Sequence, residues 1–242
     1  MFKYKNININ YKEYGDRTKP AIVYLHGWGQ LIEMMEPIAN PFQKSNHLVI
    51  LDLPGFGKSD EPKEVWSIED YADMVHELLI SLNITKPNII GHSFGGKITL
   101  MYASKYETNR IILLASPYKK STKKPSLKVR ILKKLKNIPV LNKIADKIKS
   151  KMGSTDYRNA SPIMRNILVK HVNTDIVEDI KKISCPAFII WGDKDEAVPV
   201  SDAYELEKLL KDSGLIIYEG CTHYAYLERL NQTISIIKSF MG

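Results

Sequence analysis

The sequence predicts an α/β fold, and three observations support this class. Short apolar runs alternate along the chain with amphipathic segments of helical spacing, as expected for strands that alternate with helices. Some runs are apolar at every position, as at residues 188–191, which indicates strands covered on both faces. The run at residues 87–91 leads through a Gly-His-Ser-Phe-Gly-Gly motif (residues 91–96) into a helical pattern, so a strand, a sharp turn and a helix follow one another.

The expected elements begin with an N-terminal hairpin formed by residues 2–4 and 7–14. Six further apolar runs predict strands at residues 21–25, 47–52, 87–91, 110–115, 186–191 and 215–219. Amphipathic spacing predicts helices at residues 68–82, 94–105, 202–210 and 226–240.

The alternation stops between residues 117 and 175, where the spacing favours short helices. One apolar helical face spans residues 127–138 and another spans residues 141–152. The segment holds 16 Lys or Arg against three Asp, whereas the rest of the chain is net acidic. Two interpretations are compatible: surface helices packed on the body, and a basic lid over a pocket that meets an anionic partner.

We therefore divide the chain into a first core part (1–116), a basic helical cap (117–175) and a second core part (176–242). At 242 residues, with 44% hydrophobic and 26% charged residues, the chain is long enough for one compact domain with an insertion. No apolar run approaches the roughly 18–20 residues that span a bilayer, and none opens the sequence. We expect no transmembrane segment, no signal peptide and a cytoplasmic location.

Ser93 stands at the centre of a Gly-x-Ser-x-Gly motif, where a sharp turn would expose its hydroxyl as a nucleophile. A serine hydroxyl needs a base within hydrogen-bond reach and a carboxylate that orients the base. Asp195 follows the strand at 186–191, and His223 follows the strand at 215–219. Because the carboxyl ends of parallel strands meet at one edge of a sheet, the sequence predicts a catalytic triad of Ser93, His223 and Asp195.

Other residues compete for these roles. Asp193 lies on the same loop, but Asp195 is further from the strand and better placed to reach the histidine, so Asp193 is interpreted as a loop brace or cap. The reverse assignment stays open. His26 precedes a glycine loop that it can brace through hydrogen bonds, and His92 is expected to pack or to line a pocket. Structural or exposed roles are expected for the remaining histidines, which are His47, His76 and His171.

The negative charge of a tetrahedral intermediate needs backbone N–H donors. In His-Gly-Trp-Gly (residues 26–29), the glycines allow the N–H of Trp28 to face the site, and the N–H of Phe94 comes directly after the nucleophile. Phe94 also begins a helix, whose positive end favours an anion. Trp28 and Phe94 are the expected oxyanion donors.

We expect no metal and no cofactor. The sequence contains neither His-Glu-x-x-His nor a paired-cysteine pattern, and the expected role of Cys185 and Cys221 is packing. Gly-Lys-Ser at residues 57–59 resembles the end of a phosphate-binding loop, but Asp52 stands where the first glycine of that loop is required. Nucleotide binding is therefore not expected, and the concentrated basic segment does not favour general nucleic-acid binding.

Together these motifs resemble the α/β-hydrolase superfamily. The matching residues are 26–29, 52–59, 91–96, 191–195 and His223. The resemblance implies a mostly parallel eight-stranded sheet flanked by helices, with a helical cap inserted after the sixth strand. A serine in the elbow, where haloalkane dehalogenases and soluble epoxide hydrolases have aspartate, favours ester hydrolysis.

Residues 26–29 and 51–59 are similar to the methyl-ester carboxylesterase of biotin synthesis, which acts on a substrate carried by acyl carrier protein. The elbow differs, with His92 and Phe94 where that family has Trp and Leu. The resemblance implies a cofactor-free serine hydrolase of small or medium acyl esters. C–C bond hydrolysis, thioester hydrolysis and monoacylglycerol hydrolysis use the same triad and stay open, as does a non-enzymatic module for a small ligand. An acidic carrier protein or an anionic surface is the partner expected at the basic cap.

Overall fold

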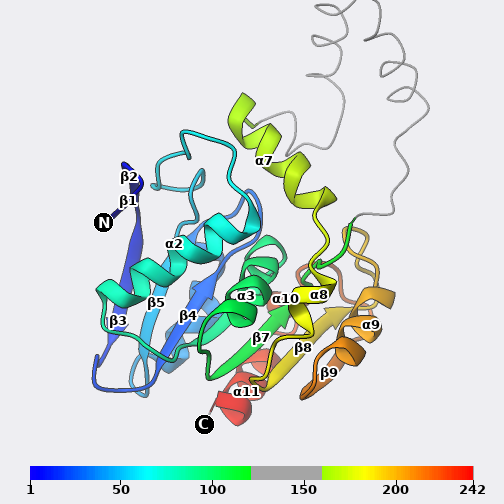
Figure 1. Cartoon of the computed structure of the whole chain (residues 1–242). Coiled ribbons are helices and arrows are strands. Elements are labelled where there is room, and N and C mark those ends of the chain that lie inside the picture. Colours follow the sequence, from blue (N-terminus) through cyan, green and yellow to red (C-terminus); the bar gives the residue numbers. More distant parts are fainter. Residues whose placement is uncertain (121–159, 242) are drawn as a thin grey trace, which may run out of the picture.

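The computed structural model describes residues 1–120 and 160–241 of the chain. Its centre is a sheet of seven strands in the order β3-β5-β4-β6-β7-β8-β9 (Figure 1). Neighbouring strands are parallel, except that the edge strand β3 pairs antiparallel with β5. The strands are β3 (Tyr11–Gly15), β4 (Ala21–Leu25), β5 (His47–Leu51), β6 (Asn88–His92), β7 (Arg110–Leu114), β8 (Ala187–Gly192) and β9 (Ser213–Tyr218).

The sheet has seven strands in the described part of the chain, which corrects the expected number of eight. The strand predicted at residues 7–14 divides at Asn10, and its first part, β2 (Ile7–Ile9), pairs with β1 (Phe2–Tyr4) in a separate sheet. The backbone N–H of Asn10 donates to the hydroxyl of Ser59 (2.8 Å), and its side-chain amide donates to Asp52 (2.8 Å). These bonds to the loop after β5 interrupt the strand.

Helices cover both faces of the sheet (Figure 1). One face carries α2 (Ile68–Ser81), α3 (Phe94–Lys105), α8 (Val177–Ile180) and α9 (Ser201–Leu209), and the other carries α1 (Glu36–Ala39) and α11 (Leu230–Met241). Short 3-10 turns at Ile32–Met34 and Asn40–Phe42 flank α1. The helix predicted at residues 226–240 divides into α10 (Ala225–Glu228) and α11, because Arg229 has non-helical angles (φ −117°, ψ 48°).

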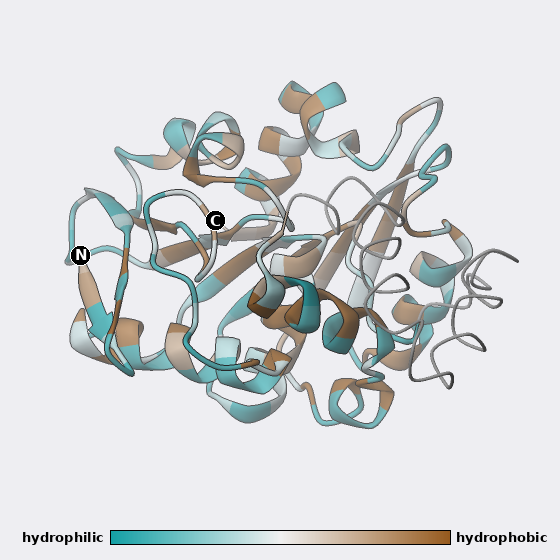
Figure 2. Cartoon of the chain, turned by 90° about the horizontal axis from the view of Figure 1, so that it is seen from above, coloured by the Kyte–Doolittle hydropathy of each residue, from teal (hydrophilic) through white to brown (hydrophobic). Residues whose placement is uncertain are grey.

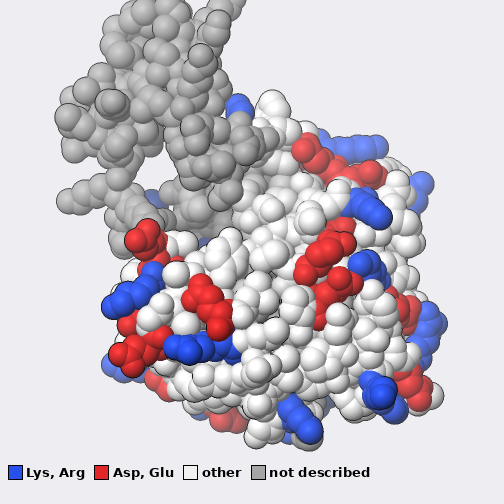
Figure 3. All heavy atoms as spheres, turned by 180° about the vertical axis from the view of Figure 1, so that it is seen from behind, with Lys and Arg blue, Asp and Glu red and all other residues white. Residues whose placement is uncertain are grey.

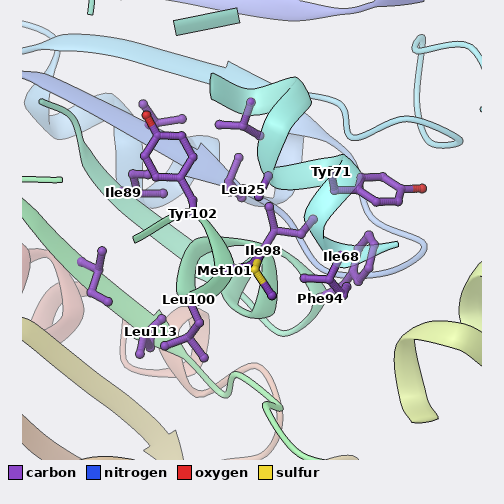
Figure 4. Packing of buried hydrophobic residues seen from close by; sticks show 14 of the residues in the cluster. Leu25, Ile68, Tyr71, Ile89, Phe94, Ile98, Leu100, Met101, Tyr102 and Leu113 are labelled. Carbon is purple, nitrogen blue, oxygen red and sulfur yellow. The ribbon is translucent and has the colours of Figure 1, made fainter. Parts of the chain in front are cut away.

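Alternate residues of each strand belong to two different cores. Val23 and Ile89 belong to the cluster beneath α2 and α3, whereas Ile22 and Ile90 belong to the cluster beneath α1 and α11. Hydrophobic residues follow the sheet and the inner helix faces in Figure 2, and Figure 4 shows α3 side chains packed among those of β4, β6 and α2. Full burial of one Ile or Val stabilises the fold by about 1.5–3 kcal/mol, so burial on both faces explains why the strands are apolar throughout.

The chain leaves the sheet after β7, which is the sixth of the predicted strands, and returns to it at β8. Within the expected cap, the structure describes residues 117–120 and 160–175, which include α7 (Pro162–Asn173). The helices predicted at residues 127–138 and 141–152 lie outside the described residues. In the part of the chain that is described, no helix has the length and apolar character needed to cross a membrane.

The two ends of the insertion meet above β7 and are fixed to the body. The N–H of Ile176 donates to the carbonyl of Tyr118 (3.0 Å), which closes the neck of the insertion. Lys119 forms ion pairs with Asp202 (3.0 Å) and Glu205 (2.6 Å) of α9. These contacts fix the point from which α7 extends along the carboxyl ends of the strands.

Candidate active site

Ser93 occupies a strained turn between β6 and α3. Its φ of +51° and ψ of −111° are rare for a residue other than glycine. The turn is tight enough to require glycine around it: a Cβ on Gly91 would lie 2.5 Å from the carbonyl oxygen of Gly95, and a Cβ on Gly95 would clash with the carbonyl of Leu25. This is the sharp strand-to-helix turn that the motif predicts, and Ser93 lies at the N-terminus of α3.

His223 and Asp195 meet on the loops that follow β9 and β8. The Nδ1 atom of His223 lies 2.7 Å from Oδ2 of Asp195, and since a carboxylate accepts, Nδ1–H is the donor. The other oxygen of Asp195 accepts the backbone N–H groups of Ala197 (2.8 Å) and Val198 (2.9 Å). The Asp195 side chain is fully buried, whereas 16% of the His223 side chain is exposed. The carboxylate therefore holds the imidazole with Nε2 free of this bond.

Asp193 takes a different place on the same loop. Its Oδ1 accepts the backbone N–H of Gly220 (2.7 Å), which joins the loop after β8 to the loop after β9. Gly220 has a φ of +73°, a conformation that glycine adopts without strain. Asp193 thus braces the loop that carries His223, as the sequence predicts for the second aspartate.

Ser93, Asp195 and His223 line one pocket of about 1090 Å3 at the carboxyl ends of the strands. Trp28 lines the same pocket, on the loop after β4. One wall is apolar and belongs to α7, with the side chains of Leu168, Val169 and Val172. The structure thus brings together side chains that are up to 195 positions apart in the sequence. A pocket of this size can hold a small-molecule substrate.

The backbone of Trp28 and Phe94 borders the elbow from both sides. The turn of residues 27–30 closes through the N–H of Gln30 and the carbonyl of Gly27 (3.2 Å), and the N–H of Gly95 donates to the carbonyl of His26 (3.1 Å). Among the described residues, the N–H groups of Trp28 and Phe94 have no acceptor. Two unpaired backbone donors beside the N-terminus of a helix can receive an anionic oxygen.

His26 braces this loop, as the sequence predicts. Its Nδ1–H donates to the carbonyl of Gly27 (2.7 Å), and its Nε2 accepts the N–H of Leu53 (2.9 Å). Because Nε2 accepts only when it carries no proton, the bond from Leu53 requires a neutral ring. Burial lowers the pKa of His26 to about 4, which keeps the ring neutral at neutral pH.

Lys97 and His171 are pocket residues that the sequence did not single out for function. Lys97 lies one turn after Ser93 and is almost fully buried; its Nζ donates to the carbonyls of His171 (3.0 Å) and Thr174 (2.6 Å) at the end of α7. Burial lowers the pKa of Lys97 to about 8. The ring of His171 stacks on that of Trp28, with 6.5 Å between ring centroids and 2° between planes. Nδ1 of His171 is buried and has no hydrogen-bond partner among the described residues. The sequence signal that could have found Lys97 is a basic residue at the fourth position after the serine, one helical turn further along.

The described residues contain no group of three or more His, Cys, Asp or Glu side chains arranged to hold a metal ion. The Gly-Lys-Ser loop at residues 57–59 is organised around Asp52, whose carboxylate accepts the N–H of Lys58 (3.0 Å) and whose carbonyl accepts the hydroxyl of Ser59 (2.6 Å). The backbone N–H of Lys58 and the hydroxyl of Ser59 thus donate to Asp52 within the fold.

Comparison with known proteins agrees with this architecture. A family model described as the alpha/beta hydrolase fold matches residues 20–135. The AB hydrolase superfamily protein YisY of Bacillus subtilis (strain 168) is 28% identical over 243 residues, which cover 90% of each chain. Monoacylglycerol lipase ABHD6 of Mus musculus is 27% identical over 257 residues, covering 93% of this chain and 76% of the relative.

Among solved structures, the α/β-hydrolase enzyme MGS-M2, from a Medee basin deep-sea metagenome library, has a TM-score of 0.79. The match has 22% sequence identity and covers 100% of this chain and 96% of that one. The chain has the α/β-hydrolase fold, and these matches support an enzyme of the α/β-hydrolase superfamily.

Proposed function

We propose that this enzyme hydrolyses carboxylic esters of small or medium acyl groups through an acyl-serine intermediate. The observation that carries the proposal is the 2.7 Å hydrogen bond between His223 and Asp195, in the pocket that also holds the strained Ser93. A nucleophile, a base and an orienting carboxylate in one pocket are the groups that acyl transfer needs.

In the proposed reaction, Nε2 of His223 takes the proton of the Ser93 hydroxyl while its oxygen attacks the ester carbonyl. The N–H groups of Trp28 and Phe94 stabilise the resulting oxyanion. The alcohol leaves with the proton held by His223, and the acyl-serine remains. A water then loses a proton to the same Nε2 and attacks the acyl-serine. The bond between the acyl group and Oγ of Ser93 breaks, Nε2 returns the proton to Oγ, and the acid is released. Asp195 stabilises the imidazolium in both steps.

The test is hydrolysis of short p-nitrophenyl esters by the wild type and by Ser93→Ala. We expect kcat to fall about 10^4-fold or more, because the nucleophile is lost while the pocket remains. A fluorophosphonate should label the wild type at Ser93 and leave the variant unlabelled. Equal turnover by both pure proteins would contradict the mechanism. Retention of a small ligand without labelling would favour the non-enzymatic alternative.

Monoacylglycerol hydrolysis is a second candidate on the same triad. Two observations favour it: the apolar α7 wall of the pocket, and the 27% identity to a relative named as a monoacylglycerol lipase. A comparison of kcat/KM for a monoacylglycerol, a simple alkyl ester, a thioester and a vinylogous diketone separates these activities, since specificity is a difference in kcat/KM.

We also propose that residues 117–175 form the cap between the two core parts, 1–116 and 176–242. The chain path supports this division, because the chain leaves the sheet after β7 and rejoins it at β8. The 16 Lys and Arg of this segment would attract an acidic carrier protein or an anionic surface. That partner and the cytoplasmic location stay predictions.

A further inference from the structure

His92 is the last residue of strand β6 and directly precedes Ser93, yet its side chain does not line the pocket. The ring is fully buried. Its Nε2 lies 3.0 Å from the backbone carbonyl oxygen of His223, and its Nδ1 lies 3.1 Å from Oε1 of Gln30. Thus the residue beside the nucleophile contacts the backbone of the residue proposed as the base.

The ring of His92 has acceptors on both sides but carries a single proton. Burial lowers the pKa of His92 to about 3, so at neutral pH one nitrogen has a proton and the other does not. Gln30 Oε1 already accepts the N–H of Gly27 (2.9 Å), whereas no other donor among the described residues reaches the carbonyl of His223. An acceptor left without a donor away from water destabilises the fold, so the proton belongs on Nε2.

The loop around His223 shows why this bond matters for geometry. On one side, the N–H of Thr222 donates to Glu228 (2.8 Å), and the N–H of Ala225 donates to the carbonyl of Thr222 (3.1 Å). The imidazole is held by Asp195. The carbonyl of His223 itself is tied to the sheet by His92. The His92 ring also packs against the rings of His223 (4.8 Å between centroids) and Tyr226 (4.8 Å).

We propose that His92 is a positioning residue that fixes the distance between the base and the nucleophile. Its Nε2–H holds the backbone of His223, and its own backbone continues directly into Ser93, so one rigid residue spans the two reacting groups. The inference rests on the proposed function of Ser93 and His223. Loss of the bond from His92 should slow the reaction, because a misplacement of about 1 Å between reacting groups can lower the rate about 100-fold.

The test compares His92→Gln with His92→Met. The Gln and Met side chains have nearly the same shape. The Gln amide carries an N–H at a position close to that of the imidazole Nε2, whereas the Met side chain has no donor. We expect His92→Gln to keep kcat within about threefold of the wild type and His92→Met to lower kcat about 10- to 100-fold. KM should change less than twofold in both, because His92 does not line the pocket. The rate of fluorophosphonate labelling of Ser93 should follow kcat.

A measurement on the wild type covers the case in which neither variant folds. Side-chain 15N NMR of histidine distinguishes the two neutral tautomers, and we expect His92 to be protonated at Nε2 at neutral pH. Protonation at Nδ1 would overturn the inference, as would equal kcat values for the Gln and Met variants. A wild type that neither hydrolyses esters nor labels at Ser93 would instead overturn the proposed function, so the two failures are distinguishable.

Discussion

Two aspartates on one loop differ in what their carboxylates contact. Asp195 accepts two backbone N–H groups on one oxygen and the imidazole N–H of His223 on the other. Asp193 accepts the N–H of Gly220 and lies 3.4 Å from the ammonium of Lys194. The first arrangement fixes the tautomer of a base, and the second fixes a loop.

Replacement of each aspartate by asparagine separates these roles. In Asp195→Asn, the amide oxygen would keep the backbone bonds, and the NH2 group would face Nδ1 of His223 and leave the proton on Nε2, where the base needs a lone pair. We expect kcat to fall about 10^2- to 10^4-fold. Asp193→Asn keeps an oxygen acceptor for Gly220 and should change kcat less than about fivefold. Steady-state kinetics of both variants checks this, and a larger loss in Asp193→Asn would reverse the assignment.

Sequence patterns reach some of these residues and miss others. The serine motif and the positions after strands 186–191 and 215–219 place Ser93, Asp195 and His223 at one sheet edge, and in the structure they line one pocket. The contacts of His92 and Lys97 have no such local pattern. Their partners are backbone carbonyls 131 and 74 positions away, and any residue type supplies a carbonyl.

Most of the long elements lie where their hydrophobic periodicity predicts them, whereas the 12-residue helix α7 (Pro162–Asn173) falls outside the predicted helix ranges and the one-turn helices are not predicted as separate elements. Strands β4 to β9 and helices α2, α3 and α9 lie within a few residues of the predicted ranges. Helices α1, α8 and α10 have four residues each, about one turn, which is too short to show a 3.6-residue period. The division of the predicted N-terminal strand depends on Asn10 and its tertiary bonds to Ser59 and Asp52, which no local pattern contains.

Helix α7 is held on the nucleophile helix by Lys97. Removal of the ammonium in Lys97→Met would leave the carbonyls of His171 and Thr174 without this donor, which costs about 1–3 kcal/mol locally. We expect faster amide hydrogen exchange in residues 162–173 and lower activity, because His171 packs on Trp28. Total stability is a poor readout, since an apolar side chain can replace a buried charge without loss.

The matched control is Lys105→Met on the same helix. Lys105 pairs with Glu69 and Asp73 of α2 at the surface and lies eight residues after Lys97 on α3. Its substitution should leave exchange in α7 unchanged. If exchange in residues 162–173 is equally slow in Lys97→Met and the wild type, Lys97 does not hold this helix.

At the scale of the whole molecule, the excess positive charge and the buried titratable groups lie in different parts of the chain. The net charge of +8 arises from residues 117–175, and the face in Figure 3 shows Lys and Arg interspersed with Asp and Glu. The amino-acid composition reveals the basic segment, but it does not reveal which polar side chains are buried. The structure buries three neutral histidines near the pocket: His26, His92 and His171. Burial lowers the pKa of each, and for His171 well below 6.5.

These histidines make stability depend on pH below neutrality. In the unfolded chain they take up protons as pH falls through about 6.5, whereas in the folded protein the pKa values of His26 and His92 are about 4 and 3. Their contribution to the free energy of unfolding is complete above pH 6.5 and is lost as pH falls towards 4, because the unfolded state then binds more protons than the folded state.

Between pH 7.5 and pH 5, His26 and His92 should each lower the free energy of unfolding by roughly 2 kcal/mol, while Asp and Glu, with ordinary pKa values near 4, stay mostly ionised. Urea unfolding at the two pH values measures this loss, and His26→Gln, which cannot titrate, should lose roughly 2 kcal/mol less than the wild type. Equal urea midpoints for the wild type at both pH values would show that these rings are not held neutral.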